Sequence, residues 1–432
     1  MAINRQTLRH LRLHKPYLPL FFFINLSFNC LPSDCVCDRK QYRVGQRVLR
    51  SYRAVRVRVR AELRVLPSPS ARHLSRIPNR LSVIILKDRE GALRASILFC
   101  FNPASIFYSS IYTESLYSLL SIGGVYQLVS GANNVGTLLL ALSGAARSNG
   151  VINVGYTCYQ TMHTAYDAVF HRRSFVLTVK VLSSGALHCL CIFIPFIVFQ
   201  AHGYYNICRG HAPDQISPWC KAKLPLLYNY IQSRYWGVGF LRYFQLKQLP
   251  NFLLASPILS LALGSIIHYV KLQPEIFLSL GFRGSSEDKN SASMFSPMGA
   301  DRRAKGSYSL KERTSTIQQE DQILRRRKQT IKGDGHSTLP VENDSSDSSR
   351  NLSVAVLPFI LHLGFMAATA FFVMHVQVAT RFLSASPPLY WFAAHLMASP
   401  INRKRWGYLI WAYSAAYILL GSLLFSNFYP FT

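Results

Sequence analysis

One carboxylate inside an apolar segment is the first residue of this sequence that could do chemistry. Residues 99–120, FCFNPASIFYSSIYTESLYSLL, are apolar and aromatic, yet they contain Glu114. An ionisable group is costly in such a segment, so Glu114 is a candidate functional residue, able to accept hydrogen bonds from substrate hydroxyls or a proton. The structural alternative is a carboxylate at a helix N-terminus, which the helix dipole stabilises. Asn102, before Pro103, should end or kink the preceding helix and is a candidate binding residue.

Three arginines stand at the ends of apolar segments, where an anionic ligand could reach them. Arg147 and Asn149 follow the small-residue segment 135–146, within Arg-Ser-Asn-Gly. A guanidinium suits phosphate because its fork presents two parallel donors, and Asn149 adds a neutral donor and acceptor. Snorkelling of Arg147 to the lipid head groups is the alternative. Two later runs repeat this theme, and their candidate binding residues are Arg242, Gln245, Gln377 and Arg381.

The segments that must position these residues are helical and apolar. The chain has 432 residues, of which 50% are hydrophobic, and a mean hydropathy of +0.14. This balance is ordinary for a polytopic membrane protein with polar loops and too apolar for a soluble one. Four segments are long enough to cross a bilayer: 182–201, 249–270, 354–376 and 408–425. Shorter or more polar segments, which fit only inside a bundle, are 93–108, 114–129, 135–146, 151–166 and 387–396. The sequence therefore predicts an all-α polytopic membrane protein.

Charge predicts how the chain crosses the membrane. Arg172, Arg173 and Lys180 precede the segment 182–201 and belong on the cytosolic side, so the loop 202–248 faces the lumen. Working backward, Glu114 and Arg147 land on that same lumenal face. The predicted divisions are an N-terminal segment 1–80, a bundle 81–270 containing that loop, a disordered cytosolic loop 271–353 and C-terminal helices 354–432.

Basic charge and cysteines exclude some functions and leave others open. The net charge is +29, and residues 39–94 hold sixteen Lys or Arg against three Asp or Glu. We interpret this charge as flanking membrane helices rather than binding nucleic acid. No cluster with metal-ligand spacing is visible, so no metal is demanded.

Cys208 and Cys220 flank a polar loop, and a disulfide between them can form if that loop is lumenal.

The motifs together resemble a known family. Residues 235–257 match the pattern YWxVGFLRYFxxxQxPNFLLAxP nearly residue for residue. With residues 99–120, 147–150 and 375–382, they resemble the GPI mannosyltransferase 2 (PIG-V) family. The resemblance implies a GT-C-type glycosyltransferase helix bundle in the endoplasmic reticulum membrane. Its reaction would move the second mannose, in α-1,6 linkage, from dolichol-phosphate-mannose to the GPI precursor, without a cofactor.

Roles and partners follow for this reaction. From their lumenal placement and charge, we expect Arg147, Arg242 and Arg381 to bind the donor, with Glu114 and Asn149 near the sugar. The two lipids are the expected partners, and a small membrane subunit is a further candidate. Two other classes stay open: an inactive truncated paralogue that only binds lipid or a partner subunit, and a transporter. The sequence shows none of the internal repeats that many transporters have.

The family pattern breaks before residue 81. The resemblance implies that the base is an Asp in a Trp-Asp motif on the first lumenal loop, but no Trp precedes Trp219 here. The family's loop can be recovered by back-translating residues 44–67, VGQRVLRSYRAVRVRVRAELRVLP, with allowed codons. When the reading frame is then shifted by one base, a consistent codon choice encodes a segment that begins Trp-Asp-Ser-Val-Tyr. That segment resembles the missing loop. We therefore hypothesise a misframed N-terminal region, back in frame by about Leu81; as written, the chain should be inactive and fold poorly before that residue.

Sequencing the transcript across codons 30–90 tests this hypothesis. We expect the shifted frame to read Trp-Asp, which would restore the base of an ordinary mannosyltransferase. A transcript that confirms residues 44–67 as written would contradict the hypothesis, and the non-catalytic interpretation would then lead.

Overall fold

The structure is a computed structural model that describes residues 69–110, 112–208, 218–283, 354–399 and 403–427. Within these ranges every regular element is a helix. The first half contains α3 (Pro69–Leu86), α4 (Arg89–Cys100), α5 (Ser105–Ser109), α6 (Glu114–Val129), α7 (Asn133–Ala146), η2 (Ser148–Asn153), α8 (Val154–Tyr166), η3 (Asp167–His171) and α9 (Phe175–Cys208). The second half contains η5 (Pro218–Lys221), α10 (Leu227–Arg234), η6 (Leu246–Gln248), α11 (Leu249–Leu272), α12 (Pro274–Leu278), η8 (Val354–Val356), α15 (Leu357–Phe372), η9 (Val376–Val378), α16 (Ala379–Leu383), α17 (Pro387–Ala398) and α18 (Arg403–Ser426).

Four of these helical stretches are long and apolar enough to cross a membrane. They are Phe175–Cys208, Leu246–Leu272, Val354–Phe372 and Arg405–Phe425. The same four segments were expected from hydropathy, and the all-helical, multi-pass fold class is thereby confirmed. The first and last expose most of their apolar side chains, as lipid-facing helices do, whereas Val354–Phe372 is mostly buried.

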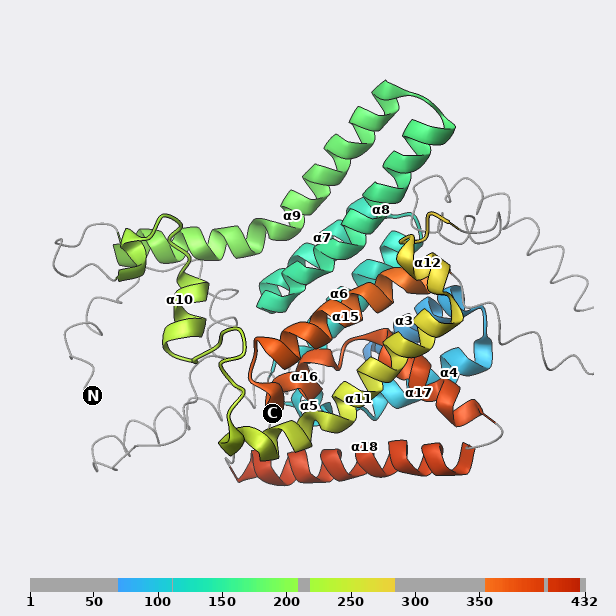
Figure 1. Cartoon of the computed structure of the whole chain (residues 1–432), viewed down its shortest axis with the longest axis vertical. Coiled ribbons are helices and arrows are strands. Elements are labelled where there is room, and N and C mark those ends of the chain that lie inside the picture. The colour runs from blue at the N-terminus through green and yellow to red at the C-terminus, as the bar shows by residue number, and fades with distance from the viewer. Residues whose placement is uncertain (1–68, 111, 209–217, 284–353, 400–402, 428–432) are drawn as a thin grey trace, which may run out of the picture.

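The core forms around α15. Leu357, Leu363 and Met366 of this helix are fully or almost fully buried, and Leu81 and Ile85 of α3 belong to the same cluster. Helix α11 packs along α15, while α17 packs against α4, α11 and α18 (Figure 1). The shorter helices α6, α7 and α8 carry polar side chains, and they are tolerated because they pack against other helices.

Helices α6 and α7 pack backbone to backbone through glycine. A Cβ on Gly136 would lie 3.0 Å from the carbonyl oxygen of Gly124, and a Cβ on Gly124 would lie 3.1 Å from that of Gly136. Small residues allow this close approach between membrane helices. The approach places the beginning of α6 next to the end of α7, where Glu114 and Arg147 lie.

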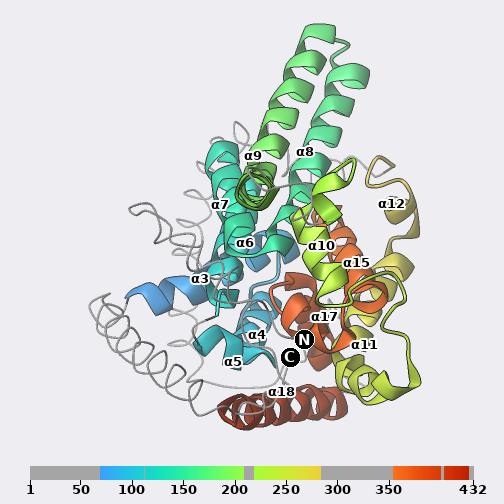
Figure 2. The same cartoon turned by 90° about the vertical axis from the view of Figure 1, so that its left-hand side faces the viewer.

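Two features extend beyond the central bundle. Helices α8 and α9 project together from one side of it, as Figure 1 and Figure 2 both show. Helix α9 bends, and Pro195 lies inside it, where proline removes a backbone hydrogen bond. At the other side, α18 lies across the bundle and contacts α17 and α5.

The boundaries differ from the sequence prediction in two places. The segment 93–108, given as one apolar segment, is divided into α4 and α5, and the predicted end of the helix at Asn102-Pro103 is confirmed. Asn102 causes the break: its side chain donates to the carbonyl of Phe99 at 2.9 Å and accepts from the amide of Ala104 at 2.8 Å. Helix α3 begins at Pro69, before the expected return to frame at Leu81. Residues 1–68 and most of the loop 271–353, with the predictions made for them, lie outside the described residues.

A disulfide between Cys208 and Cys220 ties the end of α9 to η5. We expect both thiols to resist alkylation in denatured, unreduced protein, whereas Cys100, Cys158, Cys189 and Cys191 react. Replacing both half-cystines with serine should lower the unfolding free energy by about 3 kcal/mol, because a loop of this size is no longer closed in the unfolded chain. Alkylation of Cys208 before reduction, seen by mass spectrometry, would contradict this.

Candidate anion-binding site

A buried carboxylate joins two arginines that are distant in sequence. Glu114 is the first residue of α6, and its side chain is only 2% exposed. Its Oε1 accepts hydrogen bonds from Nη1 of Arg147 and from Nε of Arg381. We call these three residues the charge cluster. The sequence placed Glu114 and Arg147 on one face of the membrane, and the structure brings them into direct contact.

Three separate elements supply the charge cluster. Arg147 caps the end of α7 in an extended conformation, which turns its side chain out of the helix. Arg381 lies in α16, a short helix after the buried α15. Helix α6 contributes Glu114 from its first turn, where the helix dipole favours a carboxylate. Glu114 and Arg147 therefore stand at the ends of packed helices, and Arg381 lies within a short one, so none of the three lies in a long loop.

The charge cluster has one more positive than negative charge. Two guanidinium groups, both mostly buried, share one carboxylate. Aromatic rings hold Arg381, whose Cζ lies 4.7 Å from the ring centre of Phe107 and 4.8 Å from that of Tyr112. Burial and the neighbouring Arg147 lower the pKa of Arg381, while Glu114 opposes that effect. An arginine still stays protonated in a protein, so the net charge of the cluster is +1.

The second carboxylate oxygen of Glu114, Oε2, is a buried acceptor without a hydrogen-bond partner among the described residues. Asn149, only 9% exposed, likewise has a buried Oδ1 with no partner in the described ranges. Buried polar atoms are normally paired. Glu114 belongs to the charge cluster and Asn149 follows Arg147 by two residues, so a polar ligand that donates hydrogen bonds can complete this site.

The turn η2 fixes Arg147 and Asn149. Gly150 approaches α7 so closely that a Cβ there would lie 2.4 Å from the amide nitrogen of Gly144 and 2.5 Å from the carbonyl oxygen of Ser143. Asn153, fully buried, donates to Oγ of Ser143 at 3.0 Å and accepts from Ser121 of α6 at 3.3 Å. Sequence reasoning missed Asn153; the polar spacing Ser-Asn-Gly-Val-Ile-Asn in an apolar chain was the signal.

The remaining predicted residues, Arg242, Gln245 and Gln377, make hydrogen bonds away from the charge cluster. Tyr243 donates to Oε1 of Gln377 at 3.2 Å and accepts from Asn251 at 2.8 Å. Gln245 donates to the carbonyl of Arg242 at 3.2 Å, and both side chains are exposed. Within the described part of the chain, no hydrogen bond links these residues to the charge cluster. The structure thus uses Gln377 to hold the segment before α11 against η9.

Asn102 also has a structural position. Both of its side-chain hydrogen bonds close the turn between α4 and α5, described above, and the side chain is 2% exposed. The turn leads into α5, which carries Phe107. Asn102 therefore acts on the charge cluster through the ring that holds Arg381.

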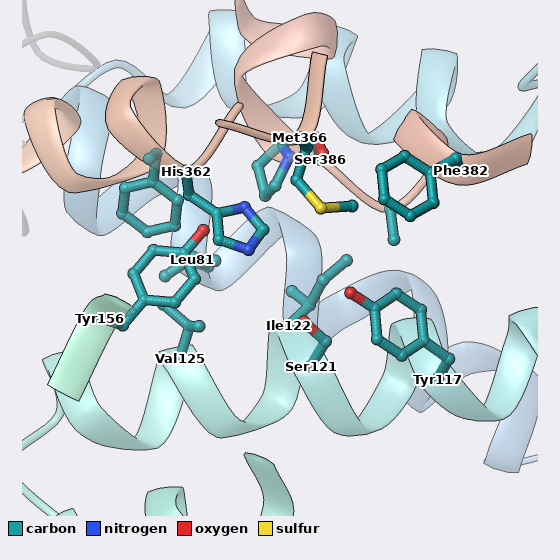
Figure 3. Close-up of a pocket in the computed structure, with 13 residues that line it drawn as sticks. Leu81, Tyr117, Ser121, Ile122, Val125, Tyr156, His362, Met366, Phe382 and Ser386 are labelled. Carbon is teal, nitrogen blue, oxygen red and sulfur yellow. The ribbon is translucent and has the colours of Figure 1, made fainter. Parts of the chain in front are cut away.

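A small cavity lies further along α6. Tyr117 and Ser121 of this helix line it, opposite Ser386 and His362 (Figure 3). Its volume is about 10 Å³, which is about the room needed by one water molecule. It is too small for a sugar, so the charge cluster is the better candidate for ligand binding. Within the described ranges, no three His, Cys, Asp or Glu side chains gather to hold a metal.

This fold and site define a class: a multi-pass, all-helical membrane protein with a buried, net positive site at one end of its bundle. The family profile described as Mannosyltransferase (PIG-V) matches residues 70–432. The chain belongs to that family, as its motifs indicated.

Individual relatives agree with this assignment. The chain is 30% identical to GPI alpha-1,6-mannosyltransferase 2 of Mus musculus over 338 residues, covering 73% of this chain and 58% of the mouse protein. The human protein of the same name is 26% identical, covering 82% and 72%. GPI mannosyltransferase 2 of Drosophila melanogaster is 28% identical, covering 82% and 71%. The chain thus spans less than two thirds of the mouse relative. No solved structure matches it.

The close contact at Gly150 can be tested by adding one methyl group. Gly150→Ala should lower the unfolding free energy by about 1–3 kcal/mol, because the new Cβ overlaps the backbone of α7. Gly155→Ala is the matched control: a Cβ there meets nothing within 4 Å, so the variant should be as stable as the parent or slightly more so. Equal melting temperatures for the two variants would show that η2 does not pack as described.

Proposed function

We propose that this protein transfers the second mannose of the GPI anchor, in α-1,6 linkage, from dolichol-phosphate-mannose to the precursor glycolipid. Membership of the PIG-V family and the names of the mouse and human relatives support this reaction. The observation that carries the proposal is the charge cluster of Glu114, Arg147 and Arg381. A buried site of net charge +1 is suited to the phosphate of a lipid donor.

The arginines fit a phosphodiester in number and in geometry. Each guanidinium has five N–H donors and donates one hydrogen bond to Glu114. The donors that remain can bind phosphate oxygens in pairs, which a lysine could not do. The rings of Phe107 and Tyr112 hold Arg381 in place before the ligand arrives. Binding therefore costs little side-chain entropy at this position.

In the proposed reaction the acceptor hydroxyl attacks the anomeric carbon of mannose as the bond to phosphate oxygen breaks. Arg147 and Arg381 stabilise the negative charge that grows on the leaving phosphate. A base must take the hydroxyl proton. Glu114 is poorly placed for this step, because protonating it would leave two buried guanidinium groups without their anion. We assign it instead to holding the arginines.

The base would then come from the Trp-Asp loop that the shifted reading frame restores, in a region outside the described residues. A lumenal setting in the endoplasmic reticulum membrane fits the disulfide between Cys208 and Cys220, because disulfides persist in oxidising compartments. A second candidate function, an inactive paralogue that binds lipid or a partner subunit, is favoured by the absence of Trp before Trp219. Mannosyl transfer by the chain as written, compared with a version carrying the Trp-Asp loop, distinguishes the two.

Replacing either arginine should abolish transfer in the version that carries the Trp-Asp loop. We expect Arg381→Gln and Arg147→Gln to lower mannosyl transfer about 100-fold, because each removes a charged donor from the leaving phosphate. The assay is transfer of labelled mannose in microsomes from cells that lack this activity.

Arg94→Gln is the matched control for these variants. Arg94 pairs with Glu90, whose side chain is 74% exposed, and it lies outside the charge cluster. Its variant should transfer mannose within about twofold of the parent, as expected for a surface ion pair. Near-normal transfer by well-folded Arg381→Gln protein would refute the phosphate-binding role.

A further inference from the structure

The charge cluster contains an anion of its own, although two arginines alone would bind phosphate more tightly. Resting on the function proposed above, we infer that Glu114 sets the charge of the site to suit the donor lipid and to favour release of the spent lipid. The donor is a phosphodiester and the spent lipid is a phosphate monoester. Glu114 is then a specificity-determining residue that acts through charge.

The two lipids differ in charge because of where the proton goes. The bond between mannose C1 and the phosphate oxygen breaks, and its electron pair stays on that oxygen. The acceptor oxygen forms the new bond to C1 and gives its proton to the base, which later passes it to water. The donor phosphate carries one negative charge, while the phosphate left behind carries between 1.5 and 2 at neutral pH, about what a phosphorylated side chain carries. The chemistry therefore raises the negative charge inside the site.

The charge of the cluster matches the donor and not the product. With Glu114 ionised the site carries +1, so a monoanion makes it neutral, whereas a dianion leaves a net negative charge in a mostly buried place. Uncompensated charge away from water is costly. A cluster without Glu114 would carry +2 and would be neutralised by the dianion. Glu114 therefore moves the preference of the site from the product toward the substrate.

The structure keeps this negative charge in place. Glu114 is 2% exposed, is held at the beginning of α6, and is bonded to both arginines through Oε1. Oε2 is buried and has no partner among the described residues, so no donor there offsets its negative charge. A growing charge on the phosphate is therefore opposed by a carboxylate that cannot turn away to solvent.

A binding experiment separates the two lipid charges. The full chain, in lipid nanodiscs, is titrated with dodecyl phosphate, a monoester, and with dodecyl methyl phosphate, a diester. Glu114→Gln keeps the size and the acceptor oxygen but removes the charge. At pH 7.5 we expect it to strengthen binding of the monoester about tenfold more than binding of the diester. The reason is that the carboxylate repels a ligand with two negative charges more strongly than a ligand with one, so its removal favours the monoester more. Glu90→Gln, the same change at an exposed pair, should alter neither.

The pH provides an internal control. A phosphate monoester loses its second proton near pH 6, so at pH 5 both ligands carry about one charge. Glu114→Gln should then strengthen both equally. The ionisable side chains around Glu114 are its partners Arg147 and Arg381 and the tyrosines Tyr108, Tyr112 and Tyr117. Arginine and tyrosine keep their protons between pH 5 and 7.5, and Glu114→Gln has no carboxylate at this position, so the pH dependence of binding to the variant reports on the ligand.

A measurement on the unaltered chain guards against misfolding of the variant. A site tuned to a monoanion should take up protons when the monoester binds near pH 6.5, seen as a binding enthalpy that depends on the buffer. Release of protons, or equal effects of Glu114→Gln on both ligands at pH 7.5, would overturn the role of Glu114. Neither result would contradict the proposed phosphate site. Failure of either ligand to bind the unaltered chain, or binding unchanged by Arg381→Gln, would instead refute the proposed function.

Discussion

Two arginines sharing one buried carboxylate is the interaction on which the rest of this structure depends. Charged groups are stable away from water only when they are paired, and here the packing of the helices must bring the paired side chains into contact. The beginning of α6, the end of α7 and the helix α16 are therefore required to meet at one point. The glycine contact between α6 and α7 and the turn η2 are the means by which two of these ends are brought together.

The same constraint accounts for polar side chains in otherwise apolar helices. Ser121, Ser143 and Asn153 join α6, α7 and η2 by hydrogen bonds in a buried region, where each bond is needed because water cannot replace it. Asn102 and Phe107 act similarly from the other side, by turning the chain between α4 and α5 and stacking on Arg381. Polar residues in this bundle thus position charge rather than merely fill space.

The sequence predicted the helices better than the contacts. Length and hydropathy identified all four spanning helices, and α6 begins at Glu114 as expected, since these properties are local. The positive-inside rule placed Glu114 and Arg147 on one face. It could not show that Arg381 shares the same oxygen, or that Gln377 bonds Tyr243 instead of the cluster, because both depend on how distant helices pack. Asn102 was assigned to binding, yet both its hydrogen bonds serve a turn.

The arrangement also bears on where the missing base must lie. A group that stabilises a leaving phosphate and a group that accepts the acceptor's proton need opposite surroundings: the first needs a net positive charge, while the second must be free to become neutral. Glu114 cannot meet the second need without releasing two buried cations. In the proposed reaction, the base must therefore come from a chain segment outside the charge cluster. That requirement makes the departure from the family pattern in residues 44–67 chemically important, because the described helices contain the proposed phosphate site while the residue expected to take the proton falls within that departure.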